Sequence, residues 1–190
     1  LTDAGLVDAD TVFERIVYLL DRLLPVAEEY NVQLGNHIAD PPLPEGFKGI
    51  TRWNSPNILH GIKRFANLSD SPMHGFNLCL GSCAQGMVDP NTEIHELIRY
   101  AGNRNQIFNV HMRNIKGGWG NFQEVYPDNG DMDFLEVMRS LRDVQYAHMI
   151  MPDHVPKHPD DPDGSQGFAF CYGYLGALIK AVNAEAEASV

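Results

Sequence analysis

The sequence predicts an α/β protein built on a parallel β-sheet, because strand-like runs and helical segments alternate four times along its 190 residues. The four strand candidates are residues 31–38, 75–82, 107–114 and 147–154. The connections between them are short on one side and long on the other, which is typical of parallel βα units. No low-complexity linker divides the chain, so we expect residues 1–190 to form a single domain.

The apolar spacing of the other segments predicts helices over residues 8–30, 55–68, 91–103, 132–144 and about 168–186. Asp10, Ser55 and Asp131 are of the residue types that cap helix starts, and Pro56 suits the first helical position. Residues 116–130 are rich in Gly, Asn and aromatic side chains, which predicts a long loop.

The strand candidates are apolar on one side and polar on the other. Along residues 107–114 the apolar side carries Phe108, Val110 and Met112, and the polar side carries Asn109, His111 and Arg113. An apolar side suits packing under helices, and a polar side suits an inner lining that carries chemistry. The same alternation occurs over residues 31–38 and 75–82.

Polar side chains gather at the ends of all four strands, which favours a (β/α)₈ TIM barrel over an open doubly wound sheet. Barrel enzymes place their chemistry at the C-terminal ends of the strands. A complete barrel needs about 250 residues, so four parallel βα units make half of one. We expect residues 1–190 to be a single partial barrel domain, the C-terminal half, without the N-terminal half.

The composition excludes some classes of function. The chain has 14 Lys and Arg against 25 Asp and Glu, a formal net charge of −11, which argues against binding nucleic acid. No apolar run reaches the roughly 18 residues that span a bilayer, so we expect no membrane partner and a soluble cytoplasmic enzyme. The odd count of three cysteines favours reduced thiols or a metal ligand over disulfides.

One ligand-type side chain stands near the end of each strand, on its polar side: His37, Cys79, His111 and Asp153. Each of them alone is more often a buried or hydrogen-bonded structural residue. Together they offer two imidazoles, a thiolate and a carboxylate, which suits Mn²⁺, Fe²⁺ or Zn²⁺ better than Mg²⁺ or Ca²⁺. A site of this kind with open positions indicates a Lewis-acidic metal in catalysis.

Four short motifs, in this order and spacing, resemble the C-terminal half of the mannonate dehydratase family. They are HIADPP from His37, LCLGS from Leu78, HMRN from His111 and PDH from Pro152, and the resemblance runs from about residue 28 to the end. It implies a xylose-isomerase-like barrel, a Mn²⁺ or Fe²⁺ cofactor and dehydration of the sugar acid D-mannonate to 2-keto-3-deoxy-D-gluconate in hexuronate catabolism. It also implies a homo-oligomer for the complete protein.

The resemblance implies that His37, Cys79, His111 and Asp153 are the metal ligands and that His154 is a catalytic acid or base. Dehydration removes a proton next to a carboxylate and expels a hydroxyl from the adjacent carbon, and a histidine can move such protons near neutral pH. The alternative for His154 is an exposed loop histidine.

Other polar residues are candidates for binding the substrate. Arg113 has the planar fork that suits a carboxylate, and its alternative is a salt bridge that closes the top of the barrel. Asn114, Arg52 and Asp40 are weaker candidates for contacting the substrate or the residues around it.

The sequence departs from the family where members usually carry a catalytic tyrosine in a Gly-Tyr pair. Here the pair reads Gly167-Phe168, and a phenyl ring cannot move a proton. Tyr172, one helical turn later, is the candidate replacement; otherwise the role is dispensable or the activity is altered.

Two alternatives from the residues stay open. One is a metal-dependent sugar isomerase or epimerase on the same barrel, against which the cysteine ligand and the HMRN and PDH motifs speak. The other is a non-catalytic half-barrel that retains motifs without a complete site.

Overall fold

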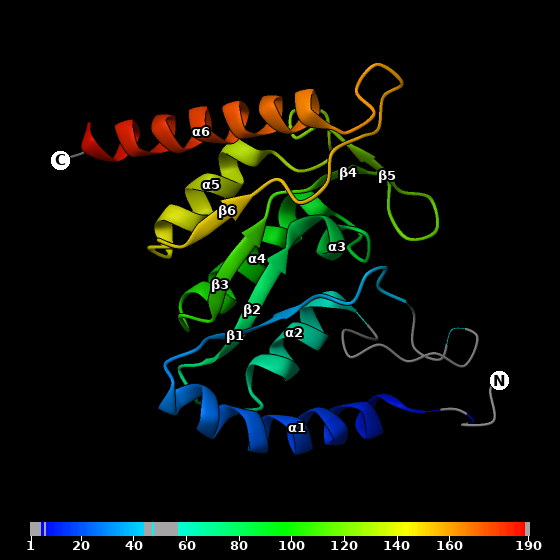
Figure 1. The fold of residues 1–190 in the computed structure, drawn as a ribbon, viewed down its shortest axis with the longest axis vertical. Helices are drawn as coiled ribbons and strands as arrows, with labels where there is room; N and C mark the ends of the chain where they lie inside the picture. Colours follow the sequence, from blue (N-terminus) through cyan, green and yellow to red (C-terminus); the bar gives the residue numbers. More distant parts are fainter. Residues whose placement is uncertain (1–4, 6, 44–46, 48–56, 189–190) are drawn as a thin grey trace.

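The computed structural model describes residues 5, 7–43, 47 and 57–188, which form alternating strands and helices (Figure 1). In chain order the elements are α1 (Ala9–Glu29), β1 (Leu34–His37), α2 (Ile58–Ala66), β2 (His74–Cys79), α3 (Leu80–Ala84), α4 (Pro90–Gly102), β3 (Ile107–His111), β4 (Asn114–Lys116), β5 (Gln123–Val125), α5 (Phe134–Asp143), β6 (Met149–Met151) and α6 (Ser165–Glu187).

The predicted parallel sheet is confirmed. Strands β1, β2, β3 and β6 pair in this order, and all three pairings are parallel. The C-terminal ends of the strands therefore meet at one edge, where Cys79 is paired with His111 and His111 with Met151. In the described part of the chain, β1 and β6 are the outer strands of this sheet.

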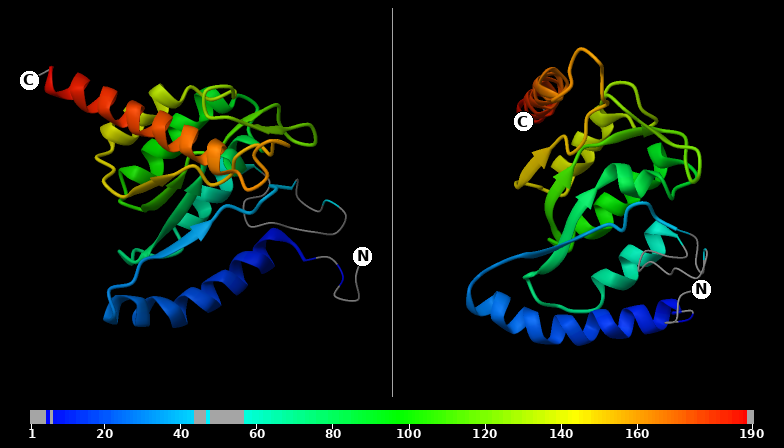
Figure 2. Two further views of the ribbon diagram at one scale, coloured as in Figure 1. Left: turned by 45° about the horizontal axis from the view of Figure 1, so that its top comes forward. Right: turned by 45° about the vertical axis from the view of Figure 1, so that its right-hand side comes forward.

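The two faces of the sheet differ in burial. Phe76, Leu78 and Val110 are completely buried and belong to the hydrophobic core that the helices share. On the opposite face, Asn109 is half-buried and Met149 is 65% exposed. Helices α2, α4, α5 and α6 contact one another in sequence, and Figure 2 shows α1 and α6 at opposite ends of the sheet. One face is thus covered by helices, and the other carries the polar side chains.

Two local predictions are wrong. The second strand does not run to residue 82 but ends at Cys79, because the chain turns directly into the short helix α3. In α3, Leu80, Cys83 and Ala84 are all completely buried, a helical spacing that the alternation before it conceals. The segment predicted as a long loop contains β5, which pairs antiparallel with β4.

The caps of two helices also differ from the prediction. Asp8, not Asp10, caps α1 by accepting the Thr11 amide at 2.8 Å. Asp10 lies in the first turn and pairs with Arg64 at 2.7 Å. Asp133 caps α5.

The predicted cap Asp131 instead accepts the Gly117 amide at 2.8 Å, next to the β4–β5 pair. Ser55 and Pro56 lie outside the described residues, and Asn57 caps α2 by accepting the His60 amide at 2.8 Å. None of the described helices combines the length and apolar character needed to cross a lipid bilayer.

Candidate metal centre

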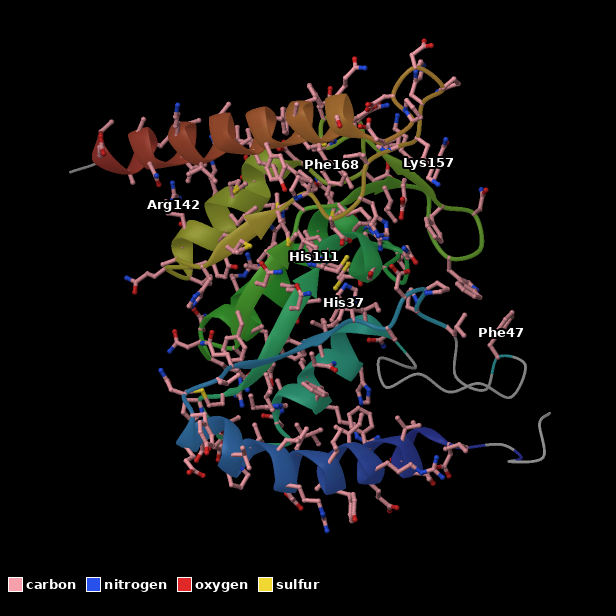
Figure 3. All side chains as sticks on the ribbon, viewed as in Figure 1. His37, Phe47, His111, Arg142, Lys157 and Phe168 are labelled. Atoms are coloured by element: carbon pink, nitrogen blue, oxygen red, sulfur yellow. The ribbon has the colours of Figure 1, made fainter. Side chains whose placement is uncertain are left out.

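Four ligand-type side chains converge at the C-terminal edge of the sheet, as the strand pattern predicts. The donor atoms of His37, Cys79, His111 and Asp153 all lie within 4.8 Å of one another. Figure 3 shows His37 and His111 close together at the ends of their strands, and their ring centroids are 5.2 Å apart. Residues from four separate βα units thus meet around one point.

His37 is held with one ring nitrogen free for a ligand. Its Nδ1 lies 2.6 Å from the carbonyl oxygen of Ile38. A carbonyl oxygen only accepts hydrogen bonds, so Nδ1 carries the proton and Nε2 has a free lone pair. This arrangement is typical of metal-binding histidines, whose second nitrogen donates to a fixed acceptor.

The Nδ1 of His111 lies 3.1 Å from Asp153 Oδ1. This buried atom nevertheless forms no hydrogen bond of acceptable geometry among the described residues. Its Nε2 lies 3.1 Å from Asn77 Nδ2, and Asn77 Oδ1 accepts from Asn109 at 3.0 Å. Burial lowers the pKa of His111, but the neighbouring Asp153 and Cys79 outweigh burial and raise the pKa to about 9. A divalent ion would have to displace the ring proton, and it would satisfy Nδ1.

Cys79 and Asp153 complete the group. The Cys79 Sγ lies 3.6 Å from Asp153 Oδ2 and is completely buried. Burial raises the pKa of Asp153, but its contact with His111 and the charges of His154 and Arg113 lower the pKa overall. Asp153 has φ 71, a left-handed conformation that costs a non-glycine residue about 1–3 kcal/mol and that is typical of functional sites.

The donor set fits a first-row divalent ion. Two imidazoles and a thiol favour Mn²⁺, Fe²⁺ or Zn²⁺ over Mg²⁺ or Ca²⁺, and the carboxylate is acceptable to each of the three. His111 Nδ1 also supports this assignment, since it lies near Asp153 but forms no hydrogen bond within the described part of the chain, and a buried polar atom normally forms one.

Arg113 lies at the centre of an ion-pair network beside the four ligands. Its Nη2 donates to Asp40 at 2.7 Å and to Ser82 at 2.9 Å, and its Nη1 donates to Glu124 at 2.7 Å. The side chain is only 2% exposed. A substrate carboxylate would have to replace Asp40 or Glu124 to reach the fork, so the geometry favours the salt-bridge alternative.

Asp40 is 30% exposed, the most open member of this network after Glu124. Burial raises the pKa of Asp40, but hydrogen bonds and charge from Arg113 outweigh burial and lower the pKa. Asn114 is 1% exposed, and its amide bonds the backbone of Pro127 and Met132, which holds the 127–132 segment in place. A substrate contact by Asn114 would require breaking these bonds, and Arg52 lies outside the described residues.

A cavity of about 620 Å³ lies on the Asp153 side of the four candidate ligands. Asp153, His154, Glu124, Lys157 and Phe168 are among its lining residues, and Figure 3 shows Phe168 and Lys157 on the side of α6 and the preceding loop. His154 is 51% exposed and lies directly after the candidate ligand Asp153. A titratable histidine thus faces the space beside the candidate metal.

Tyr172 lies on α6 with its ring 6.3 Å from that of Phe168, centroid to centroid, and is 56% exposed. It is not among the residues that line the cavity. Phe168, where the resemblance led us to expect a tyrosine, thus lines the cavity, whereas Tyr172 lies one turn further along α6.

Sequence reasoning missed Glu124, Ser82, Asn77 and Gly81. Gly81 is required by a close approach, because a Cβ there would lie 2.4 Å from Arg113 Nε. Its place two residues after a strand-end ligand was the available signal. Nothing local marks Glu124, since its partners lie 11 and 30 residues away.

The parallel sheet and the four-donor group at its C-terminal edge define an α/β protein with a candidate metal site. The model of the family "D-mannonate dehydratase (UxuA)" matches residues 3–187. The chain belongs to this family.

Individual mannonate dehydratases are similar to this chain in sequence and in structure. The chain is 36% identical over 154 residues to a mannonate dehydratase of Thermotoga neapolitana, which is 78% of this chain and 40% of that protein. The crystal structure of mannonate dehydratase from Streptococcus suis superimposes with a TM-score of 0.81 at 30% identity, covering 95% of this chain and 52% of that one. The chain therefore spans about half the length of the relatives that it matches.

A more distant structure shows the fold alone. A D-tagatose 3-epimerase-like protein superimposes with a TM-score of 0.64 at 17% identity, covering 93% of this chain and 57% of that one. The architecture is thus similar to that of xylose-isomerase-like TIM-barrel proteins.

Proposed function

We propose that this chain carries the metal site of a mannonate dehydratase, which converts D-mannonate to 2-keto-3-deoxy-D-gluconate and water. The observation that supports it most is the convergence of His37, Cys79, His111 and Asp153 within 4.8 Å beside a cavity that His154 lines. Family membership supplies the substrate, a small sugar acid.

The proposed metal is Mn²⁺ or Fe²⁺, held by His37, Cys79, His111 and Asp153. When bound, the ion would supply Lewis acidity toward substrate oxygens and so favour charge on the acid during deprotonation. The thiol and the two imidazoles would hold the ion, and Asp153 would join it to the cavity that His154 also lines.

His154 is the proposed proton-transfer group. In the reaction a C–H bond next to the carboxylate breaks, a hydroxyl leaves the adjacent carbon, and one water is lost in total. A histidine at the cavity wall can accept the carbon-bound proton or give a proton to the leaving hydroxyl. Arg113 and Asp40 hold each other at the edge of the site, and we propose that Asp40 contacts the substrate with its exposed part.

Tyr172 is the proposed replacement for the hydroxyl that Phe168 lacks. Its ring stacks on that of Phe168, which lines the cavity together with His154. Tyr172→Phe tests this role, and unchanged turnover would exclude it.

The sheet is proposed to be one half of a (β/α)₈ barrel whose other strands come from further sequence. The outer strands β1 and β6 and the 52% coverage of the Streptococcus suis structure support this proposal. Turnover then requires those strands, in the same chain or from a partner.

The test is a thiobarbituric acid assay for the 2-keto-3-deoxy product from D-mannonate and Mn²⁺, using the chain joined to the missing half of a family member. His154→Asn should lower turnover by ~10²–10⁴-fold and retain the metal, because it removes a proton-transfer group without removing a ligand. An aldose or ketose product without loss of water would replace the dehydratase by an isomerase. If the metal were bound and no sugar acid gave a product, the chain would be a non-catalytic module.

A further inference from the structure

Two charged side chains contact the Nδ1 nitrogen of His154. Its Nδ1 lies 2.8 Å from Glu124 Oε1 and 3.0 Å from Arg113 Nη1. The same Glu124 oxygen accepts from Arg113 Nη1 at 2.7 Å. The three groups form a small triangle on the side of the ring opposite Nε2.

Only one assignment of the ring proton is compatible with this triangle. Glu124 is a carboxylate and can only accept, so a contact of 2.8 Å requires a proton on His154 Nδ1. If Nδ1 accepted from Arg113 instead, its lone pair would face the lone pairs of the carboxylate. Nδ1 is therefore protonated, and Arg113 donates to Glu124 rather than to the ring.

The consequence concerns the other ring nitrogen. With Nδ1 bonded to Glu124, the neutral ring has its lone pair on Nε2, which lies 3.9 Å from Asp153 Oδ2. His154, Glu124 and Asp153 all line the same cavity. The nitrogen that can exchange protons is thus the one beside the candidate metal.

We infer that Glu124 is a positioning residue that fixes the orientation and tautomer of His154, so that Nε2 is the nitrogen that exchanges a proton with the substrate. The inference rests on the proposed role of His154. Glu124 does not touch the reacting atoms; it acts through the ring, as the carboxylate does in a Ser-His-Asp triad. The fold contributes by placing Glu124 on β5, which the antiparallel pairing with β4 holds in register.

A purely structural role predicts something different. Glu124 also anchors Arg113, so its loss could act by loosening the ion-pair network with Asp40. That effect would lower stability and metal affinity, and it would not depend on whether residue 154 is a histidine.

The direct test is ¹⁵N NMR of the histidine ring in the metal-free chain joined to the missing half of a family member, with His154→Asn to assign the signal. The wild-type ring should carry its proton on Nδ1. In Glu124→Ala the nearby Arg113 Nη1 becomes a donor to Nδ1, so the proton should move to Nε2. Glu124→Gln should keep the wild-type tautomer, because its Oε1 can still accept both bonds. A wild-type proton on Nε2, or no change in Glu124→Ala, would overturn the inference.

Kinetics supply the second readout. Glu124→Ala should lower kcat at least ~10-fold and retain the metal affinity. The upper limit of this loss is the ~10²–10⁴-fold that side-chain proton transfer contributes. In the His154→Asn background the same substitution should have no further effect on residual turnover. The control for a lost ion pair is Glu96→Ala, which removes a carboxylate on α4 that pairs with Lys63 of α2. This variant should leave kcat unchanged.

If Glu124→Ala lowered kcat by the same factor in the wild-type and His154→Asn backgrounds, the role of Glu124 would be structural only. If no sugar acid is turned over by the wild type, the proposed function fails, but the NMR result still decides whether Glu124 fixes the ring.

Discussion

At the scale of single residues, two buried cysteines four positions apart differ in their expected roles: one is a candidate metal ligand, and the other packs in the core. Cys79 and Cys83 are both completely buried, but only the Cys79 Sγ belongs to the four-donor group. Burial, followed by the neighbouring Cys79, raises the pKa of Cys83 well above its usual value, so Cys83 stays a neutral thiol.

We predict that Cys79→Ala lowers metal affinity more than ~100-fold, since even partners of ligands contribute about 10–100-fold. Cys83→Ala should leave metal content at the wild-type level, and it controls for the loss of a buried thiol. The measurement is metal analysis of the purified variants after dialysis against a weak chelator. Equal metal content in the two variants would remove Cys79 from the site.

Asn77 orients His111 from the side away from the candidate metal. For a metal on Nδ1, the ring must carry its proton on Nε2, which an Asn77 amide turned by 180° accepts with Oδ1. The turned amide would then present Nδ2 to Asn109, whose amide must turn as well, so that its Oδ1, which has no hydrogen-bond partner among the described residues, accepts from Asn77.

We therefore predict that Asn77→Ala weakens metal binding about 10–100-fold, because the imidazole loses the acceptor that holds it. Asn109→Ala should have a smaller effect, since it supports His111 only through Asn77. A competitive titration with a fluorescent chelator measures both affinities. Unchanged affinity in Asn77→Ala would show that His111 does not depend on this contact.

At the scale of elements, the β4–β5 pair carries Glu124 to the site, and its turn depends on a glycine. Gly117 has φ +81, and a Cβ there would lie 2.2 Å from the Asn121 carbonyl oxygen. Gly118, the next residue, has only one atom near an added Cβ, at 3.8 Å.

Gly117→Ala should loosen this pair, because the left-handed conformation costs an L-residue roughly 1–2 kcal/mol before the clash is counted. Amide hydrogen exchange across residues 114–125 should become faster, and turnover should fall as Glu124 leaves His154. Gly118→Ala is the matched control and should exchange like the wild type. The same exchange in both variants would contradict the importance of this turn.

At the scale of the whole molecule, the sheet has two open edges in the part of the chain that the structure describes. Strands β1 and β6 are its outer strands, and Met149 on β6 is 65% exposed. On α1, Leu19, Leu23 and Val26 share one helix face and are 53%, 43% and 53% exposed. Open edges and apolar faces favour association.

We predict that the isolated 190-residue chain self-associates or unfolds readily and lacks dehydratase activity until further strands cover these edges. Size-exclusion chromatography with light scattering, together with the keto-acid assay, measures both properties. Joining the chain to the missing half of a family member should give a defined species with activity. A stable, active monomer of the isolated chain would contradict the half-barrel proposal.

Sequence alone was sufficient for the order of the βα units, the parallel sheet and the convergence of His37, Cys79, His111 and Asp153. These features depend on local alternation along each strand, and parallel strands bring their C-terminal ends to one edge. That the four residues bind a metal stays a prediction.

The tertiary structure alone decided the partners of those residues. The burial of Arg113 between Asp40 and Glu124, the hydrogen bonds of Asn114 to the 127–132 segment and the contact of Glu124 with His154 join positions that are 11 to 73 residues apart. Such contacts depend on how the connecting segments pack over the strand ends, and no local spacing records that packing. The candidate ligands therefore follow from the alternation along each strand, whereas the orientation of His154, the proposed proton-transfer group, arises only in the folded chain.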